Sequence, residues 1–213
     1  QRTAKSNQIM SLKILSPFGP KMAQLSLPKS LVAKINQEVD KIVTNNMLSK
    51  KYNYSKKLAG EVEQEIEMPN IFVNKFLKKF FEINFKSFVK DVTGKTAKKV
   101  KLKNFWVVRQ FANDYNPIHF HDGDISGVGY LKLPKNFSKS KKKYSTNGSI
   151  DFVHGSRMFL NKSILNHKPK VGDLLFFPNY LMHTAYPFSV EGERRSFSFN
   201  AEIDKSISKI FHG

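Results

Sequence analysis

Two stretches in the first half of the chain carry apolar residues at the spacing of an amphipathic helix. Pro28 opens the first, whose apolar positions are Leu31, Val32, Ile35, Val39, Ile42 and Val43. Pro69-Asn70 opens the second, which runs from Ile71 to Val92 and is rich in phenylalanine. Proline near the start and Gly94 beyond the end suit helix termini. The pattern therefore predicts two helices, and we expect the phenylalanine stripe to pack on a sheet.

From Lys101 onward the pattern changes to short apolar runs that turn-forming residues separate. The predicted strands are Phe105–Val108, Ile125–Leu133, Ile150–Val153, Asp173–Phe177 and Ser196–Ala201. A weak alternation over Ile9–Leu15 predicts an edge strand. The polar stretch Lys50–Lys57 predicts a loop, and the lysine-rich stretch Lys139–Gly148 predicts a long hairpin loop. Helices followed by strands favour an α+β protein, in which helices brace one face of a sandwich or jelly roll.

These elements predict one domain preceded by a tail. The polar residues 1–8 lack the apolar core of a signal peptide and are expected to form a flexible tail. Residues 9–213 are expected to form a single domain, with a helical part over about 9–98 and a β core over about 99–204. No segment is apolar for the length of a membrane span, so the sequence predicts no membrane partner.

The formal net charge of +19 raises the question of an anionic partner. Lysine supplies nearly all of this charge, because the chain contains only five arginines. Lysine suits a general solvated surface, whereas specific recognition of phosphate and bases relies on the arginine fork. A nucleic-acid partner is therefore possible on charge but not favoured. The absence of cysteine excludes a disulfide framework and a cysteine nucleophile, and it fits a reducing compartment.

The candidate chemistry is concentrated in three of the six histidines. His119 and His121 are two positions apart, and His183 lies downstream, followed by Arg194-Arg195-Ser196. Side chains at i and i+2 of a strand project from one face. Imidazole is the commonest ligand for iron, zinc and copper. This spacing indicates a mononuclear metal site with an anionic ligand held by an arginine.

Four sequence stretches resemble a known family. They are NPIHFHDG at 116–123, ISGVGYLKLP at 125–134, GDLLFFP at 172–178 and RRSFSFN at 194–200, with His183 between the last two. Together they resemble the prolyl-4-hydroxylase-like superfamily of 2-oxoglutarate/Fe(II)-dependent oxygenases, particularly a branch found in marine bacteriophages and bacteria. The resemblance implies an α+β fold built on a double-stranded β-helix, or jelly roll, with N-terminal helices packed on the larger sheet.

The same resemblance implies cofactors and residue roles. It implies that Fe(II) is bound and that 2-oxoglutarate and O2 are co-substrates, with release of succinate and CO2. His183 matches the distal histidine ligand of the metal, and Arg194 with Ser196 matches the motif that binds the 5-carboxylate of 2-oxoglutarate. Arg194 is favoured over Arg195 because the two point to opposite faces of a regular strand. Tyr130 is a further candidate donor to 2-oxoglutarate.

The first part of the metal motif departs from the family, which has His-x-Asp. Here His121 stands where aspartate is expected after His119, and Gly123 stands there if the count begins at His121. In the favoured reading His119, His121 and His183 bind the metal together. In the other, His121 and His183 bind it, with Asp122 or Asp124 completing the site and His119 supporting it.

The leading hypothesis is an oxygenase that hydroxylates a peptide or protein residue such as proline, in the cytoplasm of a host cell if a phage encodes it. One alternative is a cupin-like three-histidine dioxygenase that does not use 2-oxoglutarate, which the Arg-x-Ser motif disfavours. Another is a basic nucleic-acid-binding module on a β-sandwich. The remaining histidines, His154, His167 and His212, are expected to be surface or structural residues.

Overall fold

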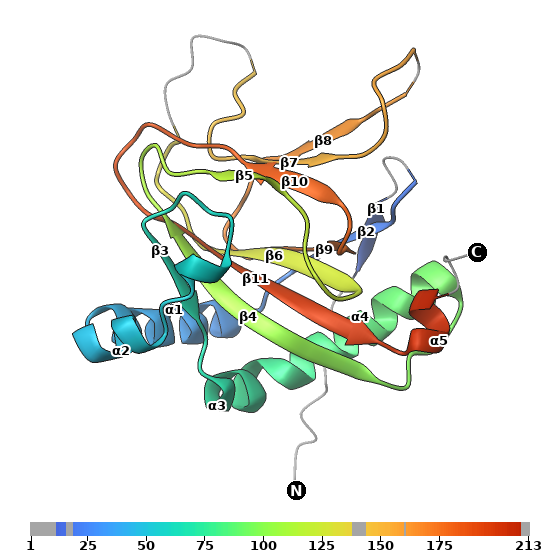
Figure 1. The fold of residues 1–213 in the computed structure, drawn as a ribbon, viewed down its shortest axis with the longest axis horizontal. Helices are drawn as coiled ribbons and strands as arrows, with labels where there is room; N and C mark the ends of the chain where they lie inside the picture. The colour runs from blue at the N-terminus through green and yellow to red at the C-terminus, as the bar shows by residue number, and fades with distance from the viewer. Residues whose placement is uncertain (1–11, 16–18, 138–143, 160, 210–213) are drawn as a thin grey trace, which may run out of the picture.

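Two antiparallel sheets lie one above the other in the computed structural model, which describes residues 12–15, 19–137, 144–159 and 161–209 (Figure 1). The large sheet has the order β1 (Lys13–Leu15), β2 (Met22–Ser26), β9 (Asp173–Pro178), β6 (Ile125–Lys132), β11 (Arg194–Ile203), β4 (Val100–Gln110) and β3 (Gln64–Glu67). The small sheet has the order β5 (Asn116–His119), β10 (Met182–Ala185), β7 (Ile150–Val153) and β8 (Ile164–His167). The two layers form an open jelly roll.

The helices cover the outer face of the large sheet, on the side away from the small sheet (Figure 1). They are α1 (Lys29–Val43), α2 (Asn46–Lys51), α3 (Asn70–Phe72), η2 (Val73–Leu77), α4 (Lys78–Thr93) and α5 (Lys205–Ser208). A further short helix, η1 (Ser55–Lys57), lies beside β3 and is not part of this layer. The buried residues of α1 recur at helical spacing and are Leu31, Ile35, Val39 and Ile42. Gly94 ends α4 in the left-handed conformation that glycine adopts at little cost. The fold thus confirms the α+β jelly roll with helices on its larger sheet.

Phenylalanine rings join the helical layer to the large sheet. The ring of Phe81 on α4 lies within 6.0 Å, between centroids, of Phe105, Phe197 and Phe199 on the sheet. Two glycines of β6 make room for this packing, because a Cβ atom on Gly127 or Gly129 would come within 2.3 Å of the ring of Phe199 or Phe197. The predicted phenylalanine stripe is therefore a packing surface.

An ion-pair network that is buried at Arg195 and Glu193 and exposed at Asp40 ties β11 to α1. Arg195 donates to Glu193 and pairs with Asp40 of α1, with Nη2 of Arg195 2.8 Å from Oδ1 of Asp40. Burial alone would raise the pKa of Glu193, but hydrogen bonds from Arg195 and Arg109 outweigh it and lower that pKa to about 2. Arg195 is thereby held toward the helices.

The structure corrects several details of the predicted elements. Lys50–Lys57 is not a plain loop, because it contains the end of α2 and all of η1. Lys139–Gly148 is not a hairpin loop, because β6 and β7, which flank it, belong to different sheets, and its residues 139–143 lie outside the described part. Ile71 is 83% exposed and takes no part in the core. Five strands were not predicted: β2, β3, β5, β8 and β10.

The proposed division of the chain is left as a prediction. Strands β1, β2 and β3 come from the part expected to be helical, and they extend the large sheet at both edges. The tail 1–8 lies outside the described residues. None of the described helices is long and apolar enough to cross a membrane.

Candidate metal and anion site

The structure brings the three predicted histidines together between the sheets. His119 ends β5 and faces His183 of β10 in register, and His121 follows two residues later. Reciprocal hydrogen bonds with Asn179 hold the backbone of His121 in place. One ring nitrogen from each histidine lies within 4.8 Å of the others. In the described part of the chain, these three histidines form the group whose ligand atoms lie close enough together to hold a metal ion.

Hydrogen bonds orient two of the three rings for metal binding. Nδ1 of His119 lies 2.7 Å from the carbonyl oxygen of Pro117, and Nδ1 of His183 lies 2.8 Å from that of Leu181. Each Nδ1–H therefore donates to the backbone, and Nε2 is left with a lone pair for a metal. Nδ1 of His121 is buried and has no hydrogen-bond partner.

The site keeps these imidazoles neutral, as a metal ligand must be. Burial lowers the pKa of His119 and moves the pKa of His183 well below its usual value. Burial and the proximity of His119 lower the pKa of His121 to about 3. The residues present thus fit a divalent metal ion that accepts nitrogen ligands.

Neither aspartate of the alternative ligand set joins this trio. Asp122 is exposed, and it lies on the wall of the neighbouring cleft. Asp124 accepts a hydrogen bond of 2.9 Å from the backbone N–H of Ile203, and its other oxygen lies 3.7 Å from Lys205. The geometry therefore favours the three-histidine reading, which stays a prediction.

Arg194 forms the second part of the site, on the inner face of the large sheet. Its side chain is buried, with the residue only 2% exposed, and it donates to the side-chain oxygen of Gln110. The guanidinium lies over the ring of Tyr130 at 5.2 Å. Among the described residues, no carboxylate pairs with Arg194, and its Nε has no hydrogen-bond partner. Buried charges are ordinarily paired, so this cation lacks the anion that its environment requires.

Ser196 and Tyr130, the other two residues predicted to contact 2-oxoglutarate, lie near Arg194. Ser196 pairs in register with Tyr130 of β6, and both residues are buried. The hydroxyl of Tyr130 is buried without a hydrogen-bond partner, and burial raises its pKa. Arg195 points to the helices, as the alternation of a strand requires. The arrangement offers a guanidinium and two hydroxyl groups to one anion.

Sequence reasoning missed other residues of this pocket. Gln110 is fully buried and holds the Arg194 guanidinium from β4. His167, expected to be a surface or structural residue, stacks on the ring of Tyr130 at 5.9 Å and lies 3.1 Å from Asp173. Gln110 continues the alternation of Trp106 and Val108 on one face of the strand, which was the available signal for it; none pointed to His167.

A cleft of about 240 Å³ opens beside the histidines. Its lining comprises Lys57, Leu58, Ala59, Gly60, Glu65, Trp106, Asn116, His119, Phe120, His121, Asp122, Ser198 and Asn200. Trp106 is both buried and part of this wall, with its ring 5.5 Å from that of His121. Arg109 does not reach the cleft, because Glu193 and Gln64 engage its guanidinium. The cleft thus opens directly beside His119 and His121.

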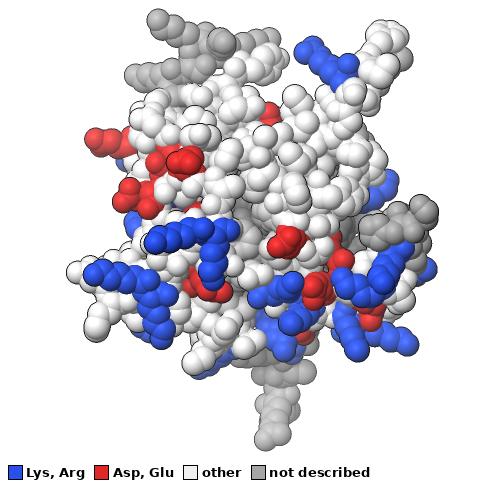
Figure 2. Space-filling model, in the orientation of Figure 1, with Lys and Arg blue, Asp and Glu red and all other residues white. Residues whose placement is uncertain are grey.

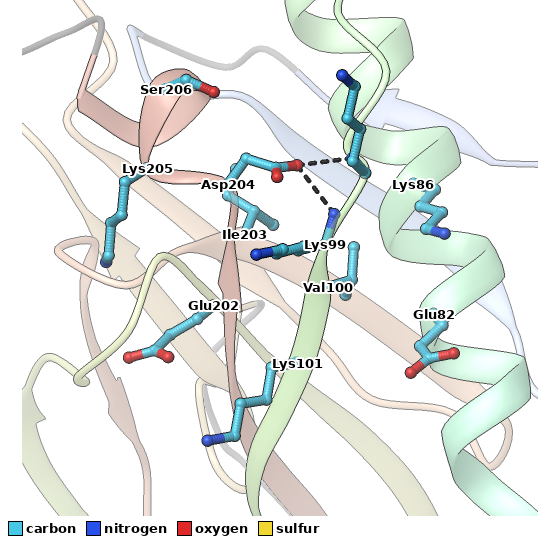
Figure 3. Close-up of a pocket in the computed structure, with 11 residues that line it drawn as sticks. Glu82, Lys86, Lys99, Val100, Lys101, Glu202, Ile203, Asp204, Lys205 and Ser206 are labelled. Atoms are coloured by element: carbon cyan, nitrogen blue, oxygen red, sulfur yellow. Dashed lines mark hydrogen bonds between the residues drawn. The ribbon is translucent and has the colours of Figure 1, made fainter.

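A larger hollow lies elsewhere, between α4 and the ends of β4 and β11 (Figure 3). Five lysines and three acidic residues line it: Lys86, Lys98, Lys99, Lys101, Lys205, Glu82, Glu202 and Asp204. Asp204 accepts hydrogen bonds from the backbone N–H groups of Lys98 and Lys99, at 2.6 and 3.0 Å. The charge of its lining is mixed, and the hollow contains none of the predicted site residues.

The family comparison matches the part of the chain that carries this site. Residues 104–200 match the model of a family described as "Putative 2OG-Fe(II) oxygenase". This match indicates a 2-oxoglutarate-dependent oxygenase and confirms the predicted resemblance. The family description includes both predicted cofactors, Fe(II) and 2-oxoglutarate. No curated protein sequence matches the chain.

Solved structures confirm the fold at low sequence identity. A Pseudomonas putida prolyl-4-hydroxylase is 12% identical with a TM-score of 0.58, over 85% of this chain and 91% of that one. A viral collagen prolyl hydroxylase from Paramecium Bursaria Chlorella virus-1, in complex with 2OG, is 18% identical with a TM-score of 0.53, over 84% and 94%. A Trichoplax adhaerens prolyl hydroxylase in complex with a peptide fragment is 10% identical with a TM-score of 0.58, over 89% and 86%.

Proposed function

We propose that this protein is an Fe(II)- and 2-oxoglutarate-dependent oxygenase that hydroxylates a peptide or protein residue, with proline as the first candidate. In the proposed reaction, one oxygen atom of O2 enters a C–H bond of the substrate, and the other enters succinate as 2-oxoglutarate loses CO2. The observation that carries the proposal is Arg194, a buried cation without a carboxylate partner among the described residues, between the same two sheets as the histidine trio. A dicarboxylate that reaches from a metal to an arginine fits this arrangement.

The proposal assigns a role to each part of the site. His119, His121 and His183 would hold the iron, which when bound supplies the oxidising chemistry. Arg194, with Ser196 and Tyr130, would bind the 5-carboxylate of 2-oxoglutarate by charge-assisted hydrogen bonds. Gln110 would fix the guanidinium, and the apolar residues around Tyr130 would keep water out.

The prolyl hydroxylases among the structural neighbours support a peptide substrate, and one of them was solved with a peptide. These neighbours are too distant in sequence to identify the residue that this protein hydroxylates. The cleft beside the histidines, with Trp106 and Phe120 on its walls, offers apolar contacts to a side chain that approaches the metal.

Turnover of 2-oxoglutarate to succinate tests the proposal. We expect Fe(II)-dependent succinate formation that rises when a peptide pool is added. Replacing Arg194 with Ala should raise the KM for 2-oxoglutarate by about two orders of magnitude, because a buried charged pair loses one partner. Exposed Arg157 offers the matched control, and Arg157→Ala should leave that KM unchanged.

Three histidine ligands also suit a dioxygenase that does not use 2-oxoglutarate. This second candidate is favoured by the histidine at position 121, where the family pattern has aspartate. It predicts oxygen consumption without succinate and no effect of Arg194→Ala on turnover. Either result would overturn the assignment of 2-oxoglutarate.

A further inference from the structure

One wall of the cleft contains a buried carboxyl group that the proposed reaction does not use. Glu65 of β3 is only 1% exposed, yet it lines the cleft beside His119 and His121. Its Oε2 has no hydrogen-bond partner. Such a group costs folding free energy unless a ligand or neighbour satisfies it. In the described part of the chain, no cation pairs with Glu65.

A second acceptor lies next to this carboxyl group. Oδ1 of Asn116 is buried and likewise has no partner. Gly60 brings the two side chains together, since a Cβ atom there would meet Oδ1 of Asn116 at 2.6 Å and Oε1 of Glu65 at 2.8 Å. Gly60 therefore packs directly against both oxygens, which lie close together in the cleft wall and are here called the acceptor pair.

The surroundings of the acceptor pair favour a cation over a neutral donor. Acidic residues occupy every second position from 61 to 67 in a protein whose net charge is +19. Figure 2 shows acidic side chains gathered on the side of the molecule where β3 lies, with lysines mostly over the helical layer below. Asp122 adds another carboxylate to the cleft wall. The one lysine of the wall, Lys57, lies over the Tyr54 ring at 4.7 Å and forms no ion pair with Glu65.

The other walls suit the stem of a long basic side chain. Leu58 and Ala59 provide apolar surface, and Trp106 and Phe120 provide aromatic rings. Lysine and arginine bury their methylene stems against such surfaces, and aromatic faces attract their charged ends. The cleft therefore combines an apolar passage with an acidic end.

We propose that Glu65 and Asn116 bind the positively charged nitrogen of a basic side chain, so that the substrate is a peptide or protein that presents lysine or arginine to the cleft. This inference rests on the proposed function, because it takes the cleft to be the route to the metal. It makes Glu65 a determinant of specificity, which selects the substrate without contacting the reacting atoms.

Matched probes test the inference by affinity. The first pair is the N-acetyl methylamides of lysine and norleucine, and the second is those of arginine and citrulline. Their affinities are measured by calorimetry on protein loaded with Mn(II) and 2-oxoglutarate, and again on metal-free protein. We expect the cationic member of at least one pair to bind at least about tenfold more tightly than its neutral counterpart.

Three variants localise the effect. Glu65→Gln should abolish the preference for the cation, because glutamine keeps the shape but cannot lose a proton to become the carboxylate that a cation would pair with. Gly60→Ala should weaken cation binding by crowding the acceptor pair. Glu67→Gln, the same change two positions along β3 and outside the cleft lining, should leave the preference intact.

Equal affinity for both members of each pair, no binding of any probe, or a preference that survives Glu65→Gln would overturn the inference. Loss of the preference in Glu67→Gln to the same extent would also overturn it. The proposed function fails on a different result, namely no stabilisation by Mn(II) with 2-oxoglutarate. The measurement on metal-free protein keeps the two failures separate.

Discussion

At the scale of single residues, polar atoms without partners mark the functional regions. Eight buried side-chain atoms in the described part of the chain have no hydrogen-bond partner. Five of them belong to residues of the cleft or of the Arg194 pocket: Glu65, Asn116, His121, Tyr130 and Arg194. Buried polar groups in folded proteins are nearly always paired. Their concentration here indicates groups arranged for ligands.

The buried carboxyl group of Glu65 makes the stability of the folded protein depend on pH. Burial raises its pKa in the folded protein to about 8, from 4.5 in the unfolded chain. Between these two values the unfolded state loses its proton first, so the contribution of Glu65 to stability falls as the pH rises from about 4.5 through 8. Glu65→Gln removes this dependence.

We expect the free energy of unfolding, measured with urea, to fall between pH 5 and pH 8 by on the order of 2–4 kcal/mol more in the native protein than in Glu65→Gln. The exposed Glu63→Gln offers a control, which should follow the native pH dependence. Parallel profiles for the native protein and Glu65→Gln would contradict the prediction.

At the scale of elements, strand β11 separates function from packing by its alternation. The side chains on its inner face are polar and include Arg194, Ser196, Ser198 and Asn200. The alternate residues Phe197, Phe199 and Ala201 belong to the hydrophobic core under the helices. Because side chains alternate across a strand, β11 presents polar residues to the site on one face and apolar residues to the core on the other. A shift of register by one residue would exchange them and destroy both.

The core side of this arrangement depends on Phe81 of α4, which contacts rings on three strands. We expect Phe81→Ala to lower the free energy of unfolding by about 3–5 kcal/mol, because it leaves a cavity among rings that cannot close around it. Ile71→Ala, at an 83% exposed position of α3, should change it by less than about 0.5 kcal/mol. Chemical denaturation measures both. A loss below 1 kcal/mol for Phe81→Ala would contradict this account of the core.

At the scale of the whole molecule, the open jelly roll brings together segments that are far apart in the sequence. The small sheet supplies His119 and His183, and the large sheet supplies Tyr130, Arg194 and Ser196. Metal and anion would thus contact both sheets at once. A ligand that binds only the folded arrangement stabilises the whole domain.

We therefore expect Mn(II) with 2-oxoglutarate to raise the melting temperature beyond the effect of Mn(II) alone. At 100 times its dissociation constant, a ligand adds about 2.7 kcal/mol to stability. Arg194→Ala should lose the 2-oxoglutarate increment and keep the Mn(II) increment, whereas His183→Ala should lose both. Differential scanning calorimetry would measure these increments. An unchanged 2-oxoglutarate increment in Arg194→Ala would show that the co-substrate binds elsewhere.

The sequence by itself determined the helices, the longer strands and the residue motifs, because these features depend on local periodicity and spacing. The helical spacing of α1 and the apolar series of α4 predicted both helices, and strand-like runs predicted β4, β6, β7, β9 and β11. The spacing of His119 and His121, and of Arg194 and Ser196, indicated metal and anion chemistry. Short edge strands such as β3 and β8 escaped prediction, because each has at most two apolar residues, and β3 also pairs with a strand far away in the sequence.

Only the tertiary structure decided which distant residues share a cavity. Gln110 and Glu65 belong to no motif, and their importance follows from the pairing of β3 with β4 and from the stacking of the two sheets. Strand alternation predicts that Arg194 and Arg195 face opposite ways, but packing against Asp40 of α1 decides which one faces the helices. Periodicity is a local property of the chain, whereas register and sheet stacking depend on the packing of the entire core.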